Sequence, residues 1–250
     1  MLSGSGSMVI FFPPVAPGFG ALKGSLPVLF ALFVTTAEAV ESITVGVGSR
    51  MLNAISSPEG KLSGDLAPLY ECVFDKAGVE PSFIEVPLKR GFNYLNRGDI
   101  DVLLPLAKSE RRDNVGLFGG ELFRGEYVFV SLKPIPPVQA MQGLRYAVPR
   151  GFIGAEFIPE GNAQVAEVGE WSQLAAMLRY DRIDVAVLPQ LIVESVFGPD
   201  VVNVFQRPAG VLPISFYLSS DTYDKGLASK LVASVGHCSV AHPLGREFGE

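Results

Sequence analysis

Hydrophobic and polar residues follow two alternating periods along the first half of the chain. Residues 43–47 alternate and are rich in β-branched side chains, which predicts a strand. Residues 49–64 are rich in Ser, Gly, Pro and Asn and predict a loop; apolar residues at helical spacing then run from about Asp65 to Gly78. The next expected elements are a strand over 82–86, a helix over 88–96 and a nearly all-apolar strand over 101–106. This β-α-β-α-β order is typical of an open α/β sheet.

The second half of the chain repeats the same order of periods. We expect a strand over 144–149, a turn over 151–154 into a short helix, a strand over 165–168 and a helix over 170–179. We then expect an apolar strand over 184–188, a helix over 190–197, strands near 201–205 and over 213–219, and a last helix that Asp221 caps and that runs to about residue 235.

One stretch of sequence occurs twice, 83 residues apart. Residues 95–102 and 178–185 each contain a helix end, a polar turn and Ile-Asp-Val, and the apolar strand that follows reaches a proline, Pro105 or Pro189. The repetition indicates two lobes built on one α/β plan, and the proline-rich residues 133–137 between them predict a linker.

The N-terminus has the three parts of an export signal. Lys23 precedes an apolar run of about nine residues over 26–34, and Ala37 and Ala39 form the small-x-small pattern of a cleavage site. We therefore expect residues 1–39 to be a signal peptide and the mature protein to be periplasmic. A retained membrane anchor is the alternative, although the run has roughly half the length that spans a bilayer. The poor fit of residues 1–21 leads to a further hypothesis, that translation starts at Leu22.

The composition excludes several classes of partner. About 210 residues follow Ala39, enough for one large or two small lobes, and the net charge is −6 without basic clusters, which argues against nucleic acid. Both histidines, His237 and His242, lie in the last fourteen residues, so no metal site is expected. We expect no cofactor and a monomer.

Of the two cysteines, Cys72 lies in a helical pattern near the expected mature N-terminus, and Cys238 follows the last helical pattern. An even pair in an oxidising compartment favours a disulfide, which would stabilise the fold by about 4–5 kcal/mol if those two helices pack together. Two free buried thiols are the alternative.

The stretch from residue 88 to 118 resembles the first lobe of the bacterial extracellular solute-binding proteins of family 3, the periplasmic components of amino-acid-type ABC importers. The resemblance rests on Gly98-Asp99-Ile100-Asp101, the apolar strand 102–107, Ser109-Glu110-Arg111-Arg112 and Phe118. Residues 145–154, 182–184 and 213–235 resemble later parts of the family. The resemblance implies a type II periplasmic binding protein-like fold of two α/β lobes, each with a mostly parallel sheet flanked by helices. We place lobe 1 at residues 40–130 and 216–250, and lobe 2 at residues 131–215.

Arg112 is similar to the family arginine that grips a ligand carboxylate, which a guanidinium can hold by two parallel hydrogen bonds. Arg111 could take this role if the register differs by one, and a surface arginine paired with Glu110 or Asp113 is the alternative. Ser109 could donate its hydroxyl to the same carboxylate. The candidate set in lobe 1 also includes Leu106, Ala107 and Ser49.

In lobe 2, the candidate residues are Gly151, Phe152, Ile153 and Gly154, whose backbone N–H groups would start a short helix and attract an anion. Phe152 and Ile153 could instead only pack within the lobe. Where family members that bind amino acids carry an Asp for the ligand ammonium, this chain has Pro189, followed by Gln190. The resemblance thus implies a small organic anion rather than an α-amino acid as ligand.

Two other functions remain to be weighed. An enzyme would need a catalytic set, but the sequence has neither a Gly-x-Ser-x-Gly elbow nor a Ser/His/Asp arrangement. The same fold also serves as the input of signalling systems, so the partner would be either an ABC permease or a membrane sensor.

Overall fold

The computed structural model describes residues 41–48, 51–198, 203–224 and 226–241. The predicted signal peptide, the candidate Ser49 and His242 lie outside these residues, as do residues 201 and 202 of the strand expected near 201–205.

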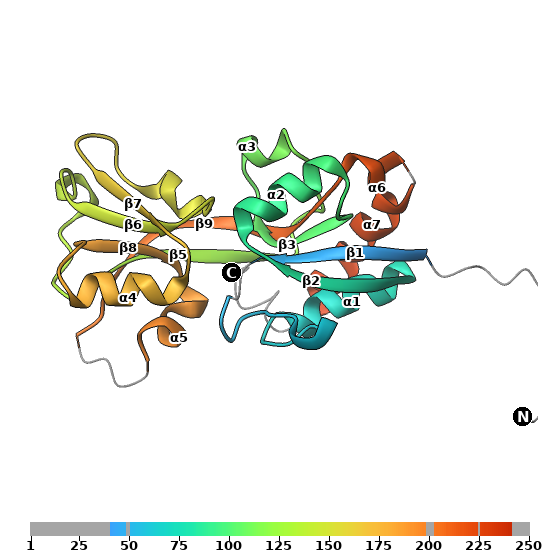
Figure 1. The fold of residues 1–250 in the computed structure, drawn as a ribbon, viewed down its shortest axis with the longest axis horizontal. Coiled ribbons are helices and arrows are strands. Elements are labelled where there is room, and N and C mark those ends of the chain that lie inside the picture. The colour runs from blue at the N-terminus through green and yellow to red at the C-terminus, as the bar shows by residue number, and fades with distance from the viewer. Residues whose placement is uncertain (1–40, 49–50, 199–202, 225, 242–250) are drawn as a thin grey trace, which may run out of the picture. The chain divides into compact units, whose positions relative to one another are not determined.

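All the strands of the described residues belong to one mixed sheet, whose order is β2-β1-β3-β9-β5-β8-β6-β7, with β4 paired to β9. Its strands are β1 Glu41–Gly48, β2 Val79–Val86, β3 Val102–Ala107, β4 Leu117–Phe118, β5 Phe123–Ser131, β6 Arg145–Pro149, β7 Gln164–Val168, β8 Val185–Pro189 and β9 Phe205–Leu218. The β2-β1-β3 and β7-β6-β8 groups are parallel, as expected, whereas β5 and β9 run antiparallel to their neighbours. The predicted two-lobed α/β fold is confirmed (Figure 1).

The α-helices lie on both sides of the β2-β1-β3 group and on one side of the β7-β6-β8 group (Figure 1). They are α1 Ala67–Ala77, α2 Leu88–Arg97, α3 Glu110–Asp113, α4 Trp171–Arg179, α5 Val193–Phe197, α6 Ser220–Asp224 and α7 Leu227–Ala241, with 3-10 turns η1 Pro58–Gly60, η2 Val138–Ala140, η3 Ile153–Phe157 and η4 Gln190–Ile192. Gly78 and Gly98 end α1 and α2 in the left-handed conformation, which a residue without Cβ adopts at little cost. None of the helices in the described part of the chain has the length and hydropathy needed to cross a bilayer.

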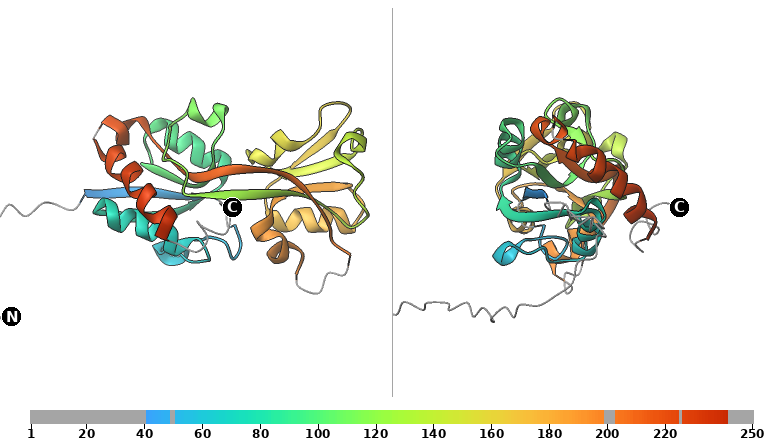
Figure 2. Two further views of the ribbon diagram at one scale, coloured as in Figure 1. Left: turned by 180° about the vertical axis from the view of Figure 1, so that it is seen from behind. Right: turned by 90° about the vertical axis from the view of Figure 1, so that its right-hand side faces the viewer.

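β5 and β9 join the two strand groups, and Figures 1 and 2 show both strands running from one group into the other. They pair from Phe123↔Ile214 to Ser131↔Phe205. β3 pairs with β9 only from Ile214 onward, and β8 pairs with β5 only over Tyr127–Val130. We call β1–β4 with α1–α3, α6 and α7 lobe 1, and β6–β8 with α4 and α5 lobe 2. The expected boundaries at 130/131 and 215/216 lie in β5 and β9, and this division remains our proposal.

The structure differs from the sequence prediction in four places. β5 was not predicted, and β9 is one strand of 14 residues where two short strands were expected. The prediction of a linker at residues 133–137 is wrong. This segment comes after the part of β5 that pairs with β8, so the chain has already entered lobe 2, and β5 and β9 are the segments that connect the lobes. The last helical region is divided into α6 and α7.

The repeated Ile-Asp-Val has the same structural role in both lobes. The Asp101 carboxylate accepts the backbone N–H of Thr44 at 2.8 Å, and the Asp101 N–H donates to the Thr44 carbonyl at 2.9 Å. Asp184 makes the same two contacts with Arg145, both at 2.8 Å. Each Asp therefore fixes the start of a buried central strand against its parallel neighbour.

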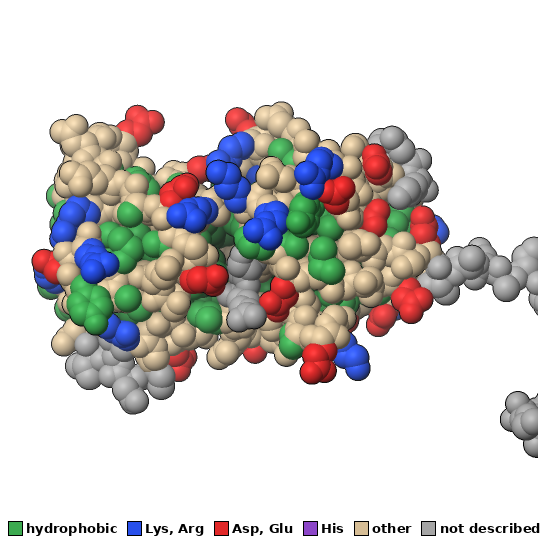
Figure 3. Space-filling model, viewed as in Figure 1, with side chains coloured by type: hydrophobic (Ala, Val, Ile, Leu, Met, Phe, Trp, Pro, Cys, Tyr) green, Lys and Arg blue, Asp and Glu red, His purple; other side chains and the backbone are tan. Residues whose placement is uncertain are grey.

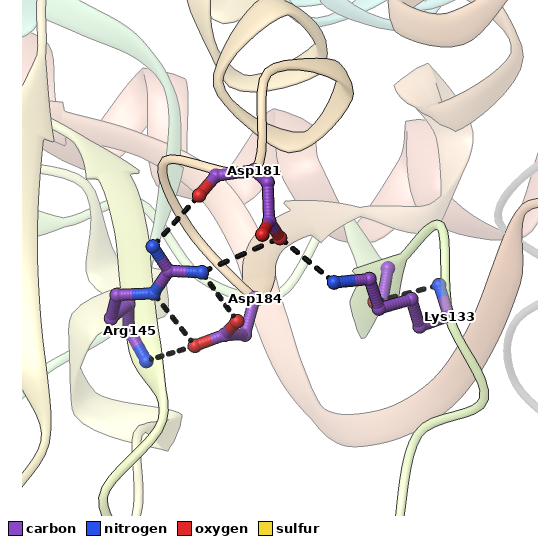
Figure 4. Close-up of polar contacts among 5 residues, drawn as sticks. Lys133, Arg145, Asp181 and Asp184 are labelled. Atoms are coloured by element: carbon purple, nitrogen blue, oxygen red, sulfur yellow. Dashed lines mark hydrogen bonds and ion pairs between the residues drawn. The ribbon is translucent and has the colours of Figure 1, made fainter.

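In lobe 2 this contact extends into an ion-pair network (Figure 4). The Arg145 guanidinium donates to both Asp184 oxygens, and Lys133 Nζ lies 2.8 Å from an Asp181 oxygen. The hydrogen bond from Arg145 holds the pKa of Asp184 below its ordinary value. The acidic residues of the repeat are thus turn and strand-entry residues, not a catalytic pair.

Lobe 1 buries apolar side chains on both faces of its strands. One core cluster includes Val102 and Leu104 of β3, and a second cluster, on the side of α2, includes Leu103 and Leu106. Burial on both faces explains why the sequence of β3 is almost entirely apolar. Buried Tyr70 of α1 donates its hydroxyl to the Ser215 carbonyl of β9 at 2.9 Å, which ties the helix layer to the sheet.

The predicted disulfide is confirmed: Cys72 of α1 is bonded to Cys238 of α7, 166 residues along the chain. The two helices pack against each other, and Cys238 is completely buried. The bond therefore links the first and last helices of lobe 1.

We predict that the double variant Cys72→Ser/Cys238→Ser has a free energy of unfolding about 4–5 kcal/mol lower than the oxidised protein, since closing so long a loop restricts the unfolded chain. Guanidinium unfolding measures the difference. The reduced wild type is the control and should match the variant; equal unfolding midpoints for variant and oxidised wild type would contradict the prediction.

Candidate functional site

A cavity of about 580 Å³ lies between the lobes and reaches β5 and β9. Its walls come from α2, the end of β3 and α3 in lobe 1, and from the ends of β6 and β8 with the start of α4 in lobe 2. The carboxyl ends of parallel strands in both lobes thus face the same space, which is where open α/β sheets bind ligands. Figure 3 shows the surface hollowed between the two lobes.

The structure brings seven of the eleven predicted ligand residues together in the cavity wall: Leu106, Ala107, Arg112, Phe152, Ile153, Pro189 and Gln190. Ser109, Gly151 and Gly154 are neighbours of these residues in the chain but do not line the cavity. Ser49 lies outside the described residues.

Arg112 lies deep in this wall, with 3% of its surface exposed, whereas Arg111 is exposed and does not line the cavity. The Nη1 of Arg112 donates to the Ala107 carbonyl at 2.7 Å, and its Nη2 donates across the lobes to the Gly151 carbonyl at 3.4 Å. The guanidinium carbon lies 5.2 Å from the centre of the Phe92 ring, a cation–π distance. These contacts place Arg112, not Arg111, at the cavity.

The charge of Arg112 is incompletely compensated. Burial lowers the pKa of Arg112 from its ordinary value to about 10, so the guanidinium is still a cation at neutral pH. Its Nε is buried without a hydrogen-bond partner, and within the described residues it forms no ion pair. A buried cation in this condition favours a bound anion, because a carboxylate would compensate both the charge and the unpaired donor.

Ser109 positions the short helix that carries Arg112. Its backbone N–H donates to the Tyr217 hydroxyl at 3.2 Å, and that hydroxyl donates to an Asp113 oxygen at 2.6 Å. Asp113 is thereby occupied by Tyr217 and does not pair with Arg112. The Ser109 hydroxyl is buried without a partner but lies behind the cavity wall, so the predicted contact between this hydroxyl and a ligand remains a prediction.

Aromatic residues form the opposite wall. The Phe152 ring lies 5.8 Å from Tyr127 of β5 and 4.9 Å from Trp171 at the start of α4. Phe152 and Ile153 are buried in lobe 2 and also line the cavity, so they both pack and face a ligand. Tyr127 and Trp171 were missed from the sequence: Tyr127 lies on the strand that was not predicted, and Trp171 only marked the start of a predicted helix.

The predicted backbone anion site at residues 151–154 is partly occupied by the protein itself. The Phe152 N–H donates to the Pro149 carbonyl at 3.0 Å, and the helix that follows is a five-residue 3-10 turn. Gly151, with φ of 77°, instead presents its carbonyl to Arg112. The turn therefore offers an acceptor to lobe 1 and leaves fewer free donors than the sequence predicted.

Cations outnumber acids around the cavity, although the chain as a whole carries a net charge of −6. Lys89, Arg90, Arg112, Arg124 and Arg150 line the cavity, and Glu126 is the one acidic residue among its described lining. Pro189 is buried in the lobe 2 wall. Figure 3 shows basic side chains gathered on both sides of the hollow. The local charge suits an anionic ligand.

A scan against protein-family models finds no match, and no curated protein matches the chain. Solved structures do match. A structure described as an L-cystine ABC transporter protein from Listeria monocytogenes shares 19% identity, with a TM-score of 0.70 over 84% of this chain and 99% of that one. An ancestral arginine-binding protein bound to arginine shares 17% identity and a TM-score of 0.69, over 83% of this chain and 96% of that one.

A histidine kinase sensor domain with similarity to periplasmic binding proteins also matches, with 17% identity and a TM-score of 0.68 over 81% of this chain and 92% of that one. At these identities the likeness shows a shared fold. The substrate-binding protein of an amino acid ABC transporter shares the fold as well, with 16% identity and a TM-score of 0.67 over 80% of this chain and 94% of that one.

We predict that Arg112→Met changes the free energy of unfolding of the ligand-free protein by less than about 1 kcal/mol, because relief of a buried charge offsets two lost hydrogen bonds. The same variant should lose thermal stabilisation by organic anions. Denaturant unfolding and thermal shift measure the two effects.

The exposed neighbour provides the matched control: Arg111→Met should keep the stabilisation by anions. A loss of about 3–5 kcal/mol on Arg112→Met, with anion stabilisation intact, would mean that Arg112 is a structural residue and not a ligand contact.

Proposed function

We propose that this chain is a periplasmic solute-binding protein that captures a small organic anion between its two lobes and delivers it to an ABC importer. The observation that carries the proposal is Arg112, a buried cation that forms no ion pair within the described residues, in a cavity whose charged lining residues are mostly cations. The shared fold with amino-acid binding proteins supports a capture role, and the predicted signal peptide supports the compartment.

The anionic ligand follows from the charges at the cavity. A carboxylate against Arg112 would occupy Nε and compete with the Gly151 carbonyl for Nη2, where the existing contact is long at 3.4 Å. An α-amino acid would also need an acid for its ammonium, and the end of β8 supplies Pro189 instead. Glu126 is exposed on β5 and is the remaining candidate for such a contact.

The proposed capture motion uses the β5–β9 pair as its hinge. Residues 123–126 of β5 pair with β9 but not with β8, so this short section has fewer neighbours than the strands inside either lobe. Closure brings the Gly151 carbonyl to Arg112, so that the arginine contacts both lobes at once. A ligand at Arg112 would then favour the closed state.

A second candidate function is ligand sensing for a membrane signalling protein, which the likeness to a histidine kinase sensor domain supports. The two functions share the ligand site and differ in the partner. Copurification from solubilised membranes of the source cells separates them: an ABC permease supports import, and a sensor kinase supports signalling.

We predict that organic acids, and not common L-amino acids, raise the unfolding temperature of the mature protein. A ligand at 100 times its dissociation constant adds about 2.7 kcal/mol to the free energy of unfolding, which a thermal-shift screen detects easily. Strong stabilisation by L-amino acids alone would refute the proposed ligand class.

A further inference from the structure

A second group of cations lies where the two lobes meet at the cavity. Lys89 and Arg90 belong to the first turn of α2 in lobe 1, and Arg150 follows β6 in lobe 2. A methyl group added to Gly151, the neighbour of Arg150, would lie 3.7 Å from the Cα of Lys89, so these two chain segments are in contact. All three side chains line the cavity and are exposed.

Both chain segments that meet here, the start of α2 and the residue after β6, contribute positive charge. The N-terminus of α2 has no side-chain cap and no acid in its first turn, where the helix dipole already favours negative charge. It carries two basic residues instead. Within the described residues, neither these two nor Arg150 has an acidic partner.

The remaining charges at the cavity do not compensate this cluster. Arg124 of β5 lies 3.8 Å from Glu121 and so has its own partner. Glu126, on the same strand, is the one described carboxylate that lines the cavity. The contact between the lobes therefore brings like charges together, which opposes closure unless an anion bridges them.

Two cationic positions thus face one cavity: Arg112, whose Nε is buried and unpartnered, and the cluster of Lys89, Arg90 and Arg150 at the line where the lobes meet. Apolar side chains, among them Leu106, Phe152 and Trp171, line the same cavity. We propose that the ligand is an organic dianion, with one carboxylate on Arg112, a carbon skeleton against the apolar wall and a second anionic group that bridges Lys89 and Arg90 to Arg150. This inference rests on the proposed capture of an organic anion.

Calorimetric titration of the mature protein with two matched series of probes tests it: straight-chain dicarboxylates from pentanedioate to octanedioate with terephthalate, and the monocarboxylates of equal carbon number with benzoate. At least one dianion should bind about tenfold more tightly than its monoanion, as expected for one added charge-assisted contact. This preference should shrink when the salt concentration rises from about 0.01 M to about 0.15 M, because exposed charges are screened.

The triple variant Lys89→Gln/Arg90→Gln/Arg150→Gln should reduce the dianion preference to about onefold, because dianion binding weakens more than monocarboxylate binding. The control Lys61→Gln/Lys76→Gln/Arg182→Gln removes the same total charge at exposed positions away from the cavity and should keep the preference. Equal binding of both probe series, or an unchanged preference in the first variant, overturns the dianion site and leaves the proposed function standing. Binding of neither series by the wild type refutes the proposed capture of an organic anion itself.

Discussion

The antiparallel pairing of β5 with β9 is the interaction on which the rest of this fold depends. It is where the strands of lobe 1 and those of lobe 2 become one sheet, because β3 joins at one end and β8 at the other. The same two strands also form one side of the cavity, through residues 123–127 and Ile214. The proposed hinge is therefore in direct contact with the cavity between the lobes.

The charge at the cavity is opposite in sign to the net charge of the chain. The protein is acidic overall, yet it buries one arginine and gathers exposed basic residues around a single cavity. Keeping Arg112 charged in a buried position costs free energy, which its contacts with backbone carbonyls only partly offset. In the proposed function, this cost would make the empty closed state less stable than the occupied one, so that closure depends on the ligand.

Local signals in the sequence predicted much of the fold. Gly78 and Gly98 ended helices as expected, and the repeated Ile-Asp-Val proved to be one structural device used twice. β5 escaped prediction because Arg124, Gly125 and Glu126 interrupt its apolar pattern. β9 was divided in two because of Pro208 and Pro213; Pro208 adjoins a bulge, where the missing N–H is tolerated. In the site, Arg112 was found from a local motif, but Tyr127, Trp171 and the basic cluster come together only through pairing between distant strands.

The topology also has a consequence for the order in which the chain can fold as it is synthesised. The strands of lobe 2 complete their mutual pairing within residues 123–189, a continuous stretch. In lobe 1, by contrast, one edge of β3 has no partner strand until β9 has been synthesised, and α1 has no helix to pack against until α7 is complete at residue 241. The strands of lobe 2 can thus pair with one another before β9 and α7 have been synthesised, whereas lobe 1 needs both of these elements. The disulfide between α1 and α7 can form only after Cys238 has been added to the chain.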